Sequence, residues 1–168
     1  VKKLLAAKPR FIEAGKLESG DFLVYPISQT IQDSKEISDD LLELLGYYLS
    51  EGHTTKMNGY DAVVFSFNIK ETAATDHTKR LIKAITGKNA GEVKIPAKHS
   101  INVYVYSKEL AYLCEKYCRK YADKKKLHEA IMKLPPERQK GLLKTYYIGD
   151  GSISIGKPTR IRANTTSK

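Results

Sequence analysis

The chain has 168 residues, of which 41% are hydrophobic, and this is enough for one domain with a buried core. No apolar run approaches the roughly 20 residues that span a bilayer, and the first residues do not form a signal peptide, so we expect a soluble, cytoplasmic protein. The chain contains 29 Lys and Arg but only 19 Asp and Glu, which gives a net charge of +10. Such a charge favours a polyanionic partner such as nucleic acid. Thermophilic and ribosomal proteins are basic too, so charge alone does not identify a nuclease.

The first 37 residues contain few signals of regular structure. Residues Glu18-Ser19-Gly20-Asp21 predict a tight turn, and a strand over Phe22–Tyr25 follows and stops at Pro26. Residues 27–37 are polar and have no hydrophobic period. We therefore interpret them as a linker.

From residue 38 onward the pattern predicts helices and strands in alternating groups. Ser38 or Asp39 caps a first helix that runs to about Ser50, and the pair Asn58-Gly59 is typical of a β-hairpin turn. The expected elements after the first helix are strands over 53–57 and 61–70, a helix over 71–86, strands over 92–95 and 101–106, helices over 107–121, 127–134 and 137–148, and a strand beginning at 152. This order predicts an α+β domain with a four-stranded antiparallel sheet and helices on one face.

Alternation along the central strands assigns side chains to two faces of that sheet. Val63, Phe65, Phe67 and Ile69 share one face and predict the core. The opposite face is polar and aromatic, which suits a groove of DNA, although a solvated face explains the same pattern. Its members are Ser66, Asn68, Lys70, Asn102, Tyr104 and Tyr106.

The two cysteines, Cys114 and Cys118, lie four residues apart in a helical pattern. This spacing places both on one helical face, where we expect a reduced pair packed in the core. The sequence has no other Cys or His cluster with zinc-ligand spacing.

Two segments of the chain resemble each other. Residues 44–52 read Leu-Leu-Gly-Tyr-Tyr-Leu-Ser-Glu-Gly, and residues 143–151 read Leu-Lys-Thr-Tyr-Tyr-Ile-Gly-Asp-Gly. Each is an apolar helix with small residues four apart, a spacing that lets two helices approach closely along one face. Each ends in an acidic residue followed by glycine.

Parallel packing of these helices would bring Glu51 and Asp150 together at their C-terminal ends. Two carboxylates repel each other there, and the negative ends of the helix dipoles add to the repulsion. Bound Mg²⁺ would resolve the conflict, because it prefers oxygen ligands and can promote phosphodiester cleavage. For one motif alone, an acid that merely ends a helix is the better interpretation, and it is the pair that favours a metal site.

The paired motifs resemble those of the LAGLIDADG (DOD-type) homing endonucleases. The resemblance implies the αββαββα saddle-sheet fold, in which the motif helices join two pseudo-symmetric halves and each sheet contacts the DNA major groove. It also implies site-specific, Mg²⁺- or Mn²⁺-dependent cleavage of double-stranded DNA, with Glu51 and Asp150 as metal ligands and catalytic residues. The residues we expect to contact DNA are those of the polar sheet face with Lys56, Ser154, Arg160 and Arg162.

The same family often carries a catalytic lysine, in a Lys-x-Ile-Pro segment, about two dozen residues before the second motif. Here the run Lys124-Lys125-Lys126 occupies that place, and Lys125 lies 25 residues before Asp150. Lys125 is our choice, with a role in stabilising charge near the scissile phosphate. His128 stands where the family has proline, so the register among the three lysines is open, and a solvated lysine run is the alternative.

Residues 13–26 resemble the stretch in which the splicing domain of an archaeal-type intein leads into its endonuclease. We therefore divide the chain into a splicing-domain remnant and linker (1–35), a first LAGLIDADG half-domain (36–135) and the start of a second (136–168). The second half is expected to be incomplete, so the chain could self-associate to cover apolar surface. A non-cleaving DNA- or RNA-binding module, such as a maturase or a degenerate fragment, is the alternative function, and a purely structural basic domain is a third.

Overall fold

The computed structural model describes residues 10, 12–22, 30–154 and 160–163, with the backbone alone for 152–154 and 160–163. No helix in these residues is long and apolar enough to cross a membrane. The strand expected over Phe22–Tyr25 falls mostly on residues 23–29, outside the described part. The tight turn before it is present, because the Asp21 amide donates to the Glu18 carbonyl at 3.1 Å.

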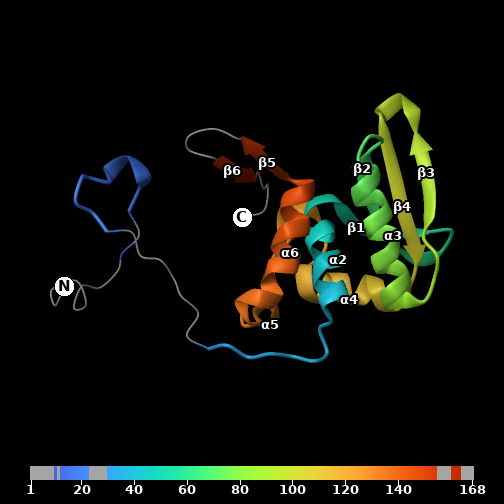
Figure 1. The fold of residues 1–168 in the computed structure, drawn as a ribbon, viewed down its shortest axis with the longest axis horizontal. Helices are drawn as coiled ribbons and strands as arrows, with labels where there is room; N and C mark the ends of the chain where they lie inside the picture. Colours follow the sequence, from blue (N-terminus) through green and yellow to red (C-terminus); the bar gives the residue numbers. More distant parts are fainter. Residues whose placement is uncertain (1–9, 11, 23–29, 155–159, 164–168) are drawn as a thin grey trace.

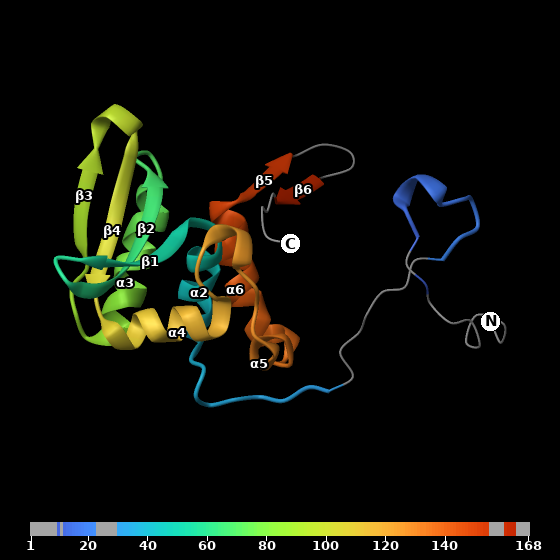
Figure 2. The same ribbon diagram turned by 180° about the vertical axis from the view of Figure 1, so that it is seen from behind.

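The α+β fold predicted from the sequence is confirmed. Strands β1 to β4 form one antiparallel sheet in the order β1-β2-β4-β3, and β5 pairs with β6 in a separate hairpin. Helices α2, α3 and α4 lie on one side of the larger sheet, and α6 packs beside α2 (Figures 1 and 2). The elements are η1 Ala14–Lys16, α2 Asp39–Glu51, β1 Gly52–Met57, β2 Tyr60–Asn68, α3 Thr72–Thr86, β3 Gly91–Ile95, η2 Pro96–Lys98, β4 Ser100–Tyr106, α4 Lys108–Cys118, η3 Ala122–Lys124, α5 Glu129–Met132, α6 Pro136–Gly149, β5 Gly151–Ser154 and β6 Arg160–Ala163.

Local signals set the boundaries of these elements. The Ser38 hydroxyl accepts a hydrogen bond from the Leu41 amide and caps α2, whose first turn carries two aspartates that favour the positive end of the helix dipole. Asn58 and Gly59 both have positive φ, as a tight hairpin turn between right-twisted strands requires. Gly87 ends α3 in the left-handed conformation.

The core lies between the sheet and the helices. Val63, Phe65 and Phe67 of β2 are buried against the apolar side of α2, as their alternation predicted. Cys114 and Cys118 are free thiols in this core, also as predicted, and burial raises the pKa of the Cys118 thiol to about 12. Neither thiol is therefore ionised or reactive near neutral pH.

Strand β2 and helix α4 end earlier than the sequence predicts, and the helix expected over 127–134 is shortened to α5. Strand β2 stops at Asn68, because the Asn68 side chain accepts a hydrogen bond from the Lys70 amide and turns the chain, so Ile69 does not continue the core face. Helix α4 stops at Cys118 rather than Tyr121, because Arg119 and Tyr121 both adopt positive φ. Such conformations are uncommon for residues other than glycine, asparagine and aspartate, and the sequence does not signal them.

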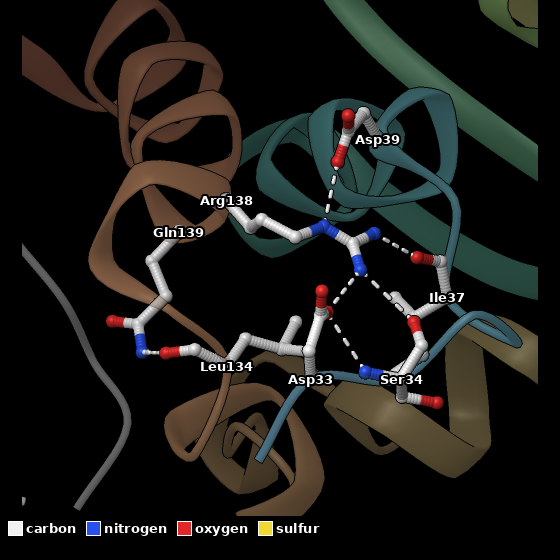
Figure 3. A network of polar contacts seen from close by, with 7 residues as sticks. All are labelled: Asp33, Ser34, Ile37, Asp39, Leu134, Arg138 and Gln139. Carbon is white, nitrogen blue, oxygen red and sulfur yellow. Dashed lines mark hydrogen bonds and ion pairs between the residues drawn. The ribbon is translucent and has the colours of Figure 1, made fainter. Parts of the chain in front are cut away.

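Arg138 of α6 joins the second motif helix to the end of the expected linker (Figure 3). Its guanidinium donates to the carboxylates of Asp33 and Asp39 and to the backbone carbonyls of Ser34 and Ile37. Ile37 is itself buried. The N-terminal ends of α2 and α6 are therefore fixed to each other by one guanidinium with four acceptors, before the helices run in parallel toward their C-terminal ends.

Candidate active site and nucleic-acid interface

The two motif helices pack against each other through their small residues, as predicted. A Cβ added at Gly46 would lie 2.0 Å from Thr145 Oγ1 and 2.2 Å from the backbone carbonyl of Leu142. One added at Gly149 would lie 2.2 Å from Ser50 Oγ. The Thr145 hydroxyl also donates across the interface to the Glu43 carbonyl at 2.7 Å. The close approach brings the C-terminal ends of α2 and α6 together.

Glu51 and Asp150 meet at these ends. Glu51 is the last residue of α2, and Asp150 follows the last residue of α6. Burial, and secondarily the charges of Asp150 and Glu71, raise the pKa of Glu51 to about 7. Burial also raises the pKa of Asp150. The charge of Asp150 thus disfavours ionisation of Glu51, as expected from the sequence for two carboxylates that lie close together.

Lys125 reaches the same point from the loop after α4. Its ammonium donates to the backbone carbonyls of Tyr48, Leu49 and Gly52 at 2.5, 2.9 and 2.8 Å, and so caps the C-terminal end of α2. Burial lowers the pKa of this lysine, while the charges of Asp150 and Glu51 oppose that shift. The neighbouring lysines point elsewhere: Lys124 lies over the Tyr121 ring, and Lys126 lines a separate hollow beside Arg119.

Tyr48 also contributes to the candidate site, although its role was not predicted from the sequence. Its ring lies under the Lys125 ammonium, with 4.9 Å between the nitrogen and the ring centroid, and its hydroxyl donates to the Arg119 carbonyl at 3.1 Å. Burial raises the pKa of Tyr48 well above its usual value, so the hydroxyl remains a donor. Tyr48 therefore holds the loop that carries Lys125. The repeated Tyr-Tyr pair was the visible signal, but its contacts are non-local.

The donor set at the helix ends fits a hard divalent cation. Two carboxylates with raised pKa are oxygen ligands whose mutual repulsion a cation would relieve. In the described part of the chain no group of three or more Asp, Glu, His or Cys side chains converges on a metal position. A cation that keeps several waters, as Mg²⁺ does, needs no such group.

The sheet face opposite the helices, here called the open face, carries most of the residues expected to contact DNA. Cross-strand pairing places Ser66 beside Asn102, and Tyr104 and Tyr106 follow on the same side of β4. Asn68 ends this row, and Lys70 lies exposed in the turn beyond it. The five strand residues are therefore brought to one surface, as the alternation predicted, whereas Lys70 lies beyond the end of β2 and not on the strand as expected.

Lys56 does not belong to the open face. It shares the helix-bearing side with Thr54 and pairs with Asp61 at 3.0 Å. Among the described residues of β1 to β4, those on the open face include no lysine, arginine or carboxylate, so the expected basic residues border this surface rather than cover it. Ser154, Arg160 and Arg162 lie in the β5–β6 hairpin, but their side chains are outside the described part.

Known proteins resemble the chain both in sequence and in structure, although no family model matches it. It is 30% identical over 152 residues to an iron–sulfur cluster assembly SufBD family protein of Mycobacterium tuberculosis, and 30% identical over 138 residues to a DNA polymerase of Thermococcus hydrothermalis. These matches cover 90% and 79% of the chain. The chain spans only 18% and 8% of those proteins.

Among solved structures, the chain resembles mesophilic variants of the homing endonuclease I-DmoI, with a TM-score of 0.50, 19% identity and coverage of 70% of this chain and 61% of that one. A second similar structure is a doubly substituted I-DmoI with nicked target DNA and manganese, with a TM-score of 0.50, 21% identity and coverage of 70% and 64%. At this identity the likeness concerns the fold.

Proposed function

We propose that this chain, which has the fold of the LAGLIDADG homing endonucleases, is the DNA-cleaving part of an intein and hydrolyses both strands of a specific duplex site. The observation that carries the proposal is the meeting of Glu51, Asp150 and Lys125 at the paired ends of two closely packed helices. The similar I-DmoI structure with nicked target DNA supports the same reaction class. The basic charge of +10 agrees with a polyanionic substrate.

The relatives support the interpretation that this chain is a segment inserted into host proteins rather than an integral part of one enzyme. A SufBD family protein and a DNA polymerase have no common activity by name, yet the same stretch of this chain matches a small part of each. A segment with its own function, carried within unrelated host proteins, accounts for this distribution. An intein endonuclease is such a segment, and the resemblance of residues 13–26 to an intein junction agrees with it.

In this proposal Glu51 and Asp150 hold a divalent cation, with Mg²⁺ or Mn²⁺ as the candidates. When bound, the cation supplies positive charge for the scissile phosphate and the leaving oxygen. Close helix packing fixes the two carboxylates at the point of cleavage, and the paired helix ends orient them in parallel. Lys125 offsets their charge and the negative end of the α2 dipole, because its ammonium is bound to the last carbonyls of that helix.

The test is Mg²⁺-dependent cleavage of a randomised plasmid library, comparing the parent chain with Glu51→Gln, Asp150→Asn and Lys125→Met. Each substitution should lower cleavage at least about 100-fold while salt-sensitive DNA binding persists. Glu137→Gln is the matched control, because it removes a carboxylate from the exposed N-terminal end of α6 and should leave cleavage unchanged. Lys124→Met and Lys126→Met test the choice of lysine in the same way.

Two results would contradict the proposal. Cleavage that survives Glu51→Gln and Asp150→Asn would remove the carboxylate pair from the mechanism. Salt-sensitive binding of the parent chain without any cleavage would instead identify a non-cleaving binding module, the alternative function. A melting curve for every variant separates lost activity from lost fold.

A further inference from the structure

The open face divides into two zones along its strands. Nearer the β1–β2 turn, the cross-strand register groups aromatic and apolar side chains, which we call the tyrosine zone. Toward the far end of β2 the same face carries hydroxyl and amide groups, which we call the amide zone. The tyrosine zone consists of Met57, Tyr60, Ala62, Val64, Tyr104 and Tyr106, and the amide zone of Ser66, Asn68, Ser100 and Asn102. On the outer strands the same face carries His53 and Thr55 of β1 beside the tyrosine zone, and Val93 and Ile95 of β3 beside the amide zone.

Ring contacts fix the tyrosine zone in shape. Tyr106 meets Tyr60 and Tyr104 edge to face, with ring centroids 6.3 and 5.6 Å apart. The Tyr104 ring lies against the backbone of β3 at Gly91, where an added Cβ would come within 2.4 Å of the ring. Val64 is only 5% exposed although its position faces away from the helices, so neighbouring side chains of the zone must cover it. These rings form a preorganised surface.

Charged groups border this surface without entering it. The Lys88 ammonium donates to the Tyr106 carbonyl at 2.9 Å, and Lys70 lies exposed beyond the opposite end of β2. Cations at the border suit phosphates, and an uncharged floor suits base edges. In the major groove the apolar group that distinguishes one base pair from another is the 5-methyl group of thymine. An aromatic floor therefore complements thymine, as hydroxyl and amide groups complement polar base edges.

We propose that the tyrosine zone recognises thymine in the target duplex through contact of the Tyr104 and Tyr106 rings with the 5-methyl group. This inference rests on the proposed function, because it names the bases that the same DNA-binding surface selects. It also commits the surface to DNA rather than RNA, since uracil lacks this methyl group.

The experiment begins with a duplex site selected for binding by the full chain from a randomised library. Each thymine of the site is then replaced singly by deoxyuridine, which removes only the methyl group. Loss of a buried methyl contact should weaken binding about three- to fivefold at one or two positions. The double variant Tyr104→Ala/Tyr106→Ala should bind the thymine and deoxyuridine duplexes equally. The double variant Tyr104→Phe/Tyr106→Phe should still bind the thymine duplex more tightly, because it keeps both rings. Asn102→Ala, from the amide zone, is the matched control and should also keep the preference for thymine over deoxyuridine.

Three outcomes overturn the inference alone. The selected site could lack fixed thymines, deoxyuridine could be tolerated at every position, or the methyl dependence could survive in the folded alanine variant. The proposed function fails differently: the chain would then show no sequence-specific binding to any duplex, or would bind without cleaving. Because the deoxyuridine comparison measures affinity, it does not depend on cleavage.

Discussion

Glu51 combines a buried position with a negatively charged neighbour, and this makes the stability of the protein sensitive to pH. In the folded chain its pKa is about 7, well above that of the same group in an unfolded chain. The folded state therefore binds the proton more tightly, and its stability decreases as pH rises from the unfolded value through 7. A carboxylate left ionised above this range destabilises the fold unless a cation compensates it.

We accordingly predict that in EDTA the Glu51→Gln variant is more stable than the parent at pH 8, and that the two are nearly equal at pH 5. The expected gain at pH 8 is about 1 to 2 kcal/mol after allowance for partial exposure of the side chain. Thermal melts at both pH values measure it. Adding Mg²⁺ at pH 8 should raise the melting temperature of the parent and not that of the variant. A parent that is equally stable at both pH values would contradict the assigned environment of Glu51.

At the level of elements, the close packing of α2 against α6 requires glycine at position 46 but not at position 141. We predict that Gly46→Ala destabilises the protein by about 3 kcal/mol or more, because the new Cβ would overlap both Thr145 Oγ1 and a backbone carbonyl that cannot move away. Gly141→Ala in α6 is the matched control. Its Cβ meets only the Glu43 side chain, at 3.1 Å, so the change should be within about 1 kcal/mol of neutral. Urea unfolding of both variants tests the pair, and equal effects would show that the helices are not in close contact at Gly46.

Elements whose ends carry a local signal could be predicted from the sequence. The Ser38 cap, the Asn58-Gly59 turn and the Gly87 terminus are each encoded by neighbouring residues. The end of α4 could not be predicted, because a tertiary contact with Tyr48 holds the Arg119 carbonyl. For the same reason the contacts of Arg138 with Asp33, Ser34 and Ile37, about a hundred positions away, were missed and these three residues were interpreted as linker.

The candidate site was predictable where the chain repeats itself. Two similar segments place Glu51 and Asp150 at equivalent positions, and the small residues of each segment imply their contact. The position of Lys125 was a choice among three adjacent lysines, and only the tertiary structure distinguishes them by their contacts. Alternation predicted the strand residues of the open face, whereas Lys56 was expected to contact DNA from the family resemblance alone and lies on the helix-bearing side, because it pairs with Asp61.

At the scale of the whole molecule, the two motif helices are unequally covered. Leu44 and Tyr48 of α2 are fully buried by the sheet and its helices. Their counterparts in the second motif, Leu143 and Tyr147 of α6, are 45% and 39% exposed, and Ile148 beside them is 45% exposed. The second motif helix thus presents an apolar stripe that the described part of the chain leaves partly open to solvent. Grouped apolar residues of this kind favour association.

We therefore predict that the 168-residue chain self-associates reversibly through this stripe. The double variant Leu143→Gln/Ile148→Gln should weaken the association by at least about tenfold, since it removes two exposed apolar side chains at the contact. Tyr112→Gln on α4 is the control, because that residue is 64% exposed outside the stripe and its loss should change nothing. Sedimentation velocity over a range of concentrations gives the association constant of each variant. A parent that stays monomeric, or a double variant that associates as the parent does, would show that α6 is not the contact surface.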